Sequence, residues 1–237
     1  MRFDFGGSPA TVLAAPMIAL ALGFTAPCTG ISALEKYSVK ELGETAPDVL
    51  SKEVREVLGQ TGYRVVNSAD KTICDLWLRI EVPVIEKFEE QLDVKYPVQP
   101  GSLLAVIRFP ANYSDYRKQK IKAGTYTLRY GHQPQDGNHL GTAQYRDFVI
   151  ASPAADDKSP APVGQETLEE MSTKVTNTTH PAILSLLPPL KGRGKLPAMA
   201  HDDTLNLEVL VVTTSTAKGS STKELQLELV TVGHAPE

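Results

Sequence analysis

Two runs near the carboxyl end decide the fold: Leu-Asn-Leu-Glu-Val-Leu-Val (205–211) and Leu-Gln-Leu-Glu-Leu-Val-Thr (225–231). In both runs apolar side chains recur at every second position, which is the period of a β-strand that buries one face. The residues between the runs, 216–223, are mostly small and polar. These features predict a long antiparallel hairpin.

Upstream of this hairpin the chain alternates between β-rich runs and turn residues. We predict strands over 62–67, 72–80, 102–109, 125–131 and 145–151, and helices over 47–59 and 166–175; residues 182–187 form a short apolar segment. The run 102–109 is apolar at nearly every position, which indicates burial of both faces, whereas the alternation in 125–131 predicts one exposed face. The Pro-, Ala- and Asp-rich stretch 152–164 is typical of an exposed loop, and 190–197 of a basic surface loop.

Strands separated by turns, without repeated helices between them, argue against a parallel α/β fold. We therefore predict a mainly β protein: an antiparallel β-sandwich with two short helices, forming one domain over residues 34–237.

The amino-terminal residues 1–33 are predicted to be a cleaved signal peptide. The apolar run 10–24 is shorter than the roughly 20 residues that span a bilayer, and Arg2 precedes it. We expect a secreted or periplasmic protein with no transmembrane span after cleavage. Pro27 stands where a lipobox has a small residue before Cys28, so a lipid anchor is disfavoured. A buried amino-terminal helix is the alternative, although Pro16 would interrupt it.

Composition excludes several classes of protein. The net charge of −4 and the pI of about 5.8 lack the basic character of nucleic-acid binders. Two cysteines are too few for a four-thiolate zinc site. Cys74 lies in a strand-like run, which indicates a buried, inert thiol, and a bond to Cys28 requires that Cys28 survive processing.

Six segments taken together carry a resemblance: 37–42 (YSVKEL), 75–79 (DLWLR), 115–119 (DYRKQ), 123–130 (AGTYTLRY), 133–139 (QPQDGNH) and 180–184 (HPAIL). In this order they resemble an uncharacterised family of secreted proteins from environmental bacteria. The resemblance implies export and a single module, but no chemistry. Residues 123–129 are also similar to a strand of transthyretin-like and carboxypeptidase-regulatory β-sandwiches.

Candidate metal ligands gather between two predicted strands. His132, Asp136 and His139 lie within one loop, and His180 could join them in space. Imidazole and carboxylate groups bind zinc and similar divalent ions. The competing interpretation is a structural turn, because such loops collect Asp, Asn and His for backbone reasons. No cofactor is expected unless this loop binds a metal.

The sequence contains no nucleophile elbow, phosphate-binding loop or dinucleotide fingerprint. We therefore expect a non-enzymatic module of the cell envelope that binds an unknown ligand or partner through loops or a sheet edge. The alternative is a metal-binding protein or metal-dependent enzyme that uses the His132–His139 loop. Aromatic residues could form a platform for sugar or peptide, or pack in the core: Trp77, Phe109, Tyr113, Tyr116, Tyr126 and Tyr130.

Overall fold

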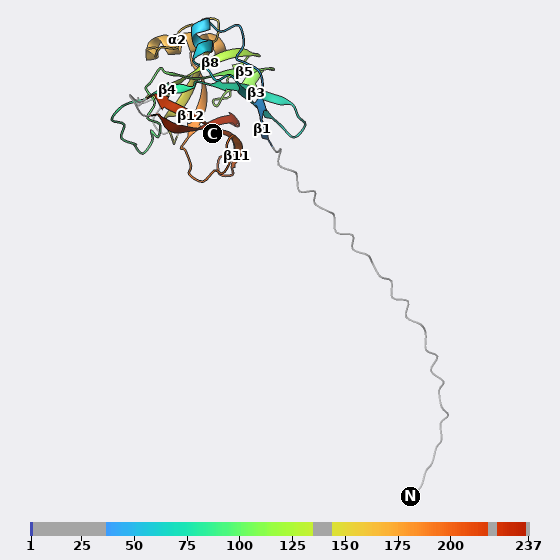
Figure 1. Cartoon of the computed structure of the whole chain (residues 1–237). Coiled ribbons are helices and arrows are strands. Elements are labelled where there is room, and N and C mark those ends of the chain that lie inside the picture. Colours follow the sequence, from blue (N-terminus) through green and yellow to red (C-terminus); the bar gives the residue numbers. More distant parts are fainter. Residues whose placement is uncertain (2–36, 135–143, 218–221, 236–237) are drawn as a thin grey trace. The chain divides into compact units, whose positions relative to one another are not determined.

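The computed structural model describes Met1 and residues 37–134, 144–217 and 222–235 (Figure 1). Residues 35–237 group into one compact unit. Within the described residues the elements follow in the order β1 (Ser38–Leu42), α1 (Lys52–Glu56), β2 (Gly62–Val66), β3 (Thr72–Leu78), β4 (Glu81–Pro83), β5 (Leu103–Phe109), β6 (Tyr113–Ser114), β7 (Lys120–Ile121), β8 (Gly124–His132), β9 (Asp147–Pro153), α2 (Gln165–Thr176), β10 (Ala182–Leu187), β11 (Ala198–Asp202), β12 (Leu207–Ala217) and β13 (Lys223–Val232).

Eleven strands join in one curled sheet, in the order β1-β2-β3-β5-β8-β9-β10-β13-β12-β11, with β4 paired to β12. The strands of the ordered path pair antiparallel with their neighbours, whereas β4 pairs parallel with β12. After a break at Arg79 and Ile80, the chain passes from β3 in one half of the sheet to β4 in the other. The two end strands, β1 and β11, lie close to each other. The sheet therefore curls around its own apolar face.

The predicted mainly β class with two helices is confirmed, and so is the carboxyl-terminal hairpin, which is β12 and β13. The first predicted helix is shorter than expected. α1 begins after Ser51, whose hydroxyl accepts a hydrogen bond from the Val54 amide at 3.1 Å, and ends at Glu56. Pro47–Leu50 forms a turn instead. The parallel β4–β12 pairing was not predicted, because three residues carry no period that sequence can show.

Apolar side chains fill the inside of the curl. The largest buried cluster draws on both halves of the sheet and includes Leu76, Leu104, Leu128, Val149, Leu186, Val212 and Leu227. Cys74 belongs to it, as predicted, and burial raises the pKa of its thiol. An apolar cavity of about 10 Å³ remains between these side chains, which is room for about one water. The interior at this point is packed, so it is not a chamber for a ligand.

A second layer covers the outer face of β3, β5 and β8. Val54 and Leu58 pack against Trp77 and Val106 there, and Ala154 joins them from the segment after β9. Strand β5 is buried on both faces, as predicted.

The expectation that β8 has one exposed face is wrong. Thr127 and Arg129, on its outer face, have no exposed surface, because residues 154–164 lie over them. We call these residues the strap. The expectation of an exposed loop at 152–164 is correct for most of these positions, but Ala154 and Asp157 are buried, at 1% and 3% exposure.

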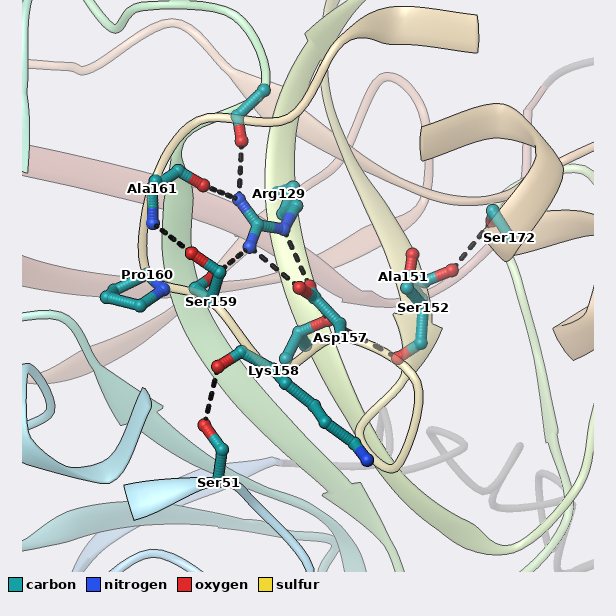
Figure 2. A network of polar contacts seen from close by, with 12 residues as sticks. Ser51, Arg129, Ala151, Ser152, Asp157, Lys158, Ser159, Pro160, Ala161 and Ser172 are labelled. Carbon is teal, nitrogen blue, oxygen red and sulfur yellow. Dashed lines mark hydrogen bonds and ion pairs between the residues drawn. The ribbon is translucent and has the colours of Figure 1, made fainter. Parts of the chain in front are cut away.

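Arg129 binds the strap from the side of the sheet (Figure 2). Its guanidinium donates to both carboxylate oxygens of Asp157, at 2.6 and 2.7 Å. It also donates to three backbone carbonyls, those of Gly101, Ser159 and Ala161. We call this set the Arg129 clamp. A buried charge is tolerated only when it is paired and hydrogen-bonded. The ion pair of Arg129 and Asp157 therefore fixes the strap against the sheet.

Candidate functional site

Several connections meet at one end of the sheet. β10 pairs antiparallel with β9 and with β13, so the end of β10 at Leu187 lies near the start of β9 and beside Glu228, in the middle of β13. By the same reasoning the end of β8 lies beside the start of β9. We call this edge the loop end. Its described connecting residues are 84–102, 133–134 with 144–146, and 188–197.

Backbone hydrogen bonds join the first two of these connections. The Arg146 amide donates to the Asp93 carbonyl at 2.8 Å, and the Gln133 amide donates to the Arg146 carbonyl at 2.9 Å. The Lys95 amide donates to the Asp147 carboxylate at 2.7 Å. Residues 84–98 are thus fixed to the base of the β8–β9 connection.

Tyr96 ties the first connection to the third. Its buried hydroxyl donates to the Leu187 carbonyl at 2.7 Å and accepts from the Glu228 amide at 3.1 Å. The carboxylate of Glu228, which has no exposed surface, accepts from the Leu190 amide and from Arg193, each at 2.6 Å. Residues 84–98 and 188–197 are therefore both anchored by the buried pair of Tyr96 and Glu228.

Below these connections lies a polar cluster made by Tyr130, His132 and Asp147. The Tyr130 hydroxyl donates to one oxygen of Asp147, and its oxygen lies 2.8 Å from His132 Nε2. Because the hydroxyl has a single proton, His132 must supply the hydrogen of the second bond from Nε2. In the neutral ring, Nδ1 is then the atom that can accept.

Burial dominates the protonation of this cluster. It raises the pKa of Tyr130, and the charge of Asp147 adds to that effect. It lowers the pKa of His132 and raises that of Asp147, although the Tyr130 hydrogen bond opposes the second shift. A nucleophilic tyrosine would need a lowered pKa. Tyr130 instead keeps its proton and serves as a bridge.

The predicted metal ligands do not converge among the described residues. His132 lies at the loop end, whereas His180 is exposed and precedes β10, at the opposite end of that strand. Asp136 and His139 lie outside the described residues. In the ranges 37–134, 144–217 and 222–235, no three His, Cys, Asp or Glu side chains are placed to hold a metal ion. His201 instead contacts Glu208 at 2.9 Å, from β11 to β12.

Sequence reasoning missed Tyr96 and Glu228, which lie 132 residues apart and meet only through strand pairing. It left open whether the aromatic residues form a platform or pack in the core, and Tyr113 is partly buried against the core, stacked on Phe109. Trp77, Phe109, Tyr116, Tyr126 and Tyr130 are buried in apolar clusters. Packing, the competing interpretation, is what the structure shows for them.

The surface of the loop end combines apolar and charged side chains. Leu92 is 92% exposed, and Ile85 is 39% exposed. The Gln91 amide donates to the Val94 carbonyl at 3.0 Å, which closes a turn that presents Leu92. Glu89 and Glu90 lie on the same loop and are exposed. A leucine so exposed on a fastened turn is a candidate contact residue.

Comparison with known proteins gives no match, whether with family models, with curated proteins or with solved structures. Neither helix in the described part of the chain has the length and apolar character needed to cross a bilayer.

Proposed function

We propose that the chain is an exported, non-enzymatic β-sandwich module of the cell envelope that recognises a partner through the loop end. The two halves of the curled sheet would supply the two layers of the sandwich, and residues 1–33 the signal for export. The resemblance to secreted proteins supports the export part of this proposal.

The exposed Leu92 carries the recognition part. Its turn is held by backbone bonds, and the segment it belongs to is fixed through Lys95 and Tyr96 to buried groups. Recognition residues commonly lie on loops that a rigid scaffold positions, and a fixed loop loses little conformational entropy on binding. Ile85 extends the apolar contact area on the same loop.

The cluster of Tyr130, His132 and Asp147 favours a role in binding over a role in catalysis. Tyr130 joins two titratable groups, but burial holds it in its protonated form. Asp147 of this cluster also accepts a hydrogen bond from the Lys95 amide, and this bond fixes residues 84–98 to the start of β9.

Site-specific photo-crosslinking in the native host tests the recognition surface. A photoreactive residue at position 92 should give a discrete adduct, because this side chain would lie in the contact. The same residue at position 49 is the matched control: Val49 is 53% exposed and lies in the segment before α1, which packs on the outer face of β3 and β5. Adducts that are equal from both positions, or absent from both, would contradict the proposal.

Two measurements on the purified native protein test the remaining parts. Its amino-terminal sequence should begin after residue 26, and the protein should fractionate with the periplasm or the medium; an intact amino terminus in the cytoplasm would contradict export. Metal analysis tests the alternative function. Stoichiometric zinc that disappears in His139→Ala would favour a metal site at the His132–His139 loop over the proposal made here.

A further inference from the structure

Two loops of opposite charge occupy the loop end. We call residues 85–95 the acidic loop and residues 190–195 the basic loop. The acidic loop contains four carboxylates and two lysines, for a net charge of −2. The basic loop contains three cations and no carboxylate. The acidic loop exposes Leu92 at 92% and Ile85 at 39%, and the basic loop exposes Leu190 at 53%.

The acidic loop is held in a defined shape. Lys95 Nζ lies 2.9 Å from a carboxylate oxygen of Glu90, and this ion pair spans the Leu92 turn. The pair uses one of the two lysines, and Glu89 remains exposed beside it. The loop therefore presents an apolar side chain next to negative charge.

The basic loop is held from the scaffold side. Glu228 binds the Leu190 amide and Arg193, and the Gln226 amide group donates to the Leu190 carbonyl at 2.9 Å. Arg193 is thus neutralised by a buried carboxylate, whereas Lys191 and Lys195 are exposed. The loop presents an apolar side chain next to positive charge.

The two loops lie side by side without neutralising each other. Tyr96, at the base of the acidic loop, bonds to Leu187 and Glu228, at the base of the basic loop. The ion pairs of the described residues nevertheless stay within each loop or run to the scaffold, and none joins Glu89 or Glu90 to Lys191 or Lys195. Both charges remain available to a partner.

We propose that the partner of the loop end is a second copy of this chain. A two-fold axis between the loops sets the acidic loop of each copy against the basic loop of the other, and it brings Leu92 toward Leu190 twice. A two-fold contact requires a self-complementary surface, which adjacent patches of opposite sign provide. The inference rests on the proposed function, since it names the partner of that surface.

Charge reversal tests this pairing by sedimentation equilibrium of the full mature chain. At 50 mM salt the wild type should be a dimer, with a dissociation constant that rises at least about tenfold at 500 mM salt, because exposed charges are screened. Glu89→Lys with Glu90→Lys should be monomeric, and so should Lys191→Glu with Lys195→Glu. In each of these variants the two loops carry the same sign.

Mixing the two variants in equal amounts should restore a dimer, because both contacts of the mixed pair are again of opposite sign. A variant that carries all four reversals should also form a homodimer. The matched control is Glu166→Lys with Glu170→Lys on α2, which changes the net charge equally at exposed positions elsewhere and should leave the dimer intact. Circular dichroism of each variant checks that it is folded.

A wild type that stays monomeric at 50 mM salt, or a mixture that fails to associate, would overturn the proposal. The crosslinker at position 92 separates this failure from that of the proposed function. An adduct of twice the chain mass supports the second copy. An adduct with a different chain keeps the loop end as the recognition surface but rejects self-association, and no adduct rejects both.

Discussion

Arg129 and Tyr130 are neighbours on β8, yet they belong to opposite kinds of polar site. Arg129 points to the outer face, where the strap seals it, and each of its nitrogens donates to an oxygen. Tyr130 points to the inner face, where its hydroxyl is hydrogen-bonded to His132 at the loop end. His132 itself is only partly buried.

The two sites have different roles. The Arg129 clamp maintains the fold, whereas the cluster of Tyr130, His132 and Asp147 supports the connections at the loop end. The Arg129 clamp contains one cation and one carboxylate, and its other partners are backbone carbonyls, so it has no group left for a ligand. All three groups of the cluster made by Tyr130, His132 and Asp147 have shifted pKa values, and the cluster lies beside exposed connections. Titratable groups with shifted pKa values cluster at functional sites.

The largest effect is expected from Arg129→Met. The change removes the cation that pairs with the buried Asp157 carboxylate, leaving it only the Thr127 hydroxyl among the described side chains, and it removes the donors to three carbonyls. We expect a loss of about 3–5 kcal/mol in the free energy of unfolding, measured by urea denaturation. Arg55→Met is the matched control, because Arg55 pairs with Asp48 at the surface and should cost less than about 1 kcal/mol. Equal losses in the two variants would mean that the clamp does not hold the strap.

A smaller effect is expected from Tyr130→Phe. This change removes the hydroxyl that bridges Asp147 and His132, so the buried carboxylate loses a donor. We expect a loss of about 1–3 kcal/mol in the same urea experiment. Tyr126→Phe, on the same strand and face, removes a hydroxyl that bonds only to the Lys122 carbonyl and should cost less. If the Tyr126 variant lost more, the cluster would not be the stabilising group on this face.

The smallest effect concerns pH. Burial lowers the pKa of His132 below its usual value of 6.5, so the folded state disfavours the protonated ring. The stability that neutral His132 contributes is full above pH 6.5 and falls as the pH drops from there toward the lowered pKa. Thermal unfolding at pH 7.5 and at pH 5.5 should therefore show a larger fall in Tm for the wild type than for His132→Gln. The difference between the two proteins reports the coupled pair of His132 and Asp147, because the charge of each group shifts the pKa of the other. A fall of the same size in both proteins would show that His132 does not titrate in this range.

Much of the fold could be predicted from local periodicity. The alternation in 205–211 and 225–231 predicted the hairpin of β12 and β13, and the apolar run 102–109 predicted a strand buried on both faces. The outer face of β8 could not be predicted in this way. Arg129 reads as solvent-exposed in an alternating strand, and only the pairing with Asp157, 28 residues later, buries it.

The candidate site was less predictable still. His132 was identified as a candidate because it is a histidine in a polar loop. Its hydrogen-bond partner Tyr130 has the pattern of a core residue, and Asp147, which Tyr130 joins to it, lies on another strand. Tyr96 and Glu228 show no local signal at all. Their bond depends on the curl of the sheet, which is a property of strand order and not of any one segment.

The clamp also has a consequence for how freely the strap can vary. Arg129 recognises Ser159 and Ala161 through their carbonyl oxygens, and Arg79 recognises Pro160 in the same way at 2.8 Å. These bonds are indifferent to side-chain identity, so within 157–161 only Asp157 is chemically specified by the arginines. The outward-facing positions of the strap are therefore a natural place to graft a peptide tag or a labelling site without disturbing the rest of the molecule.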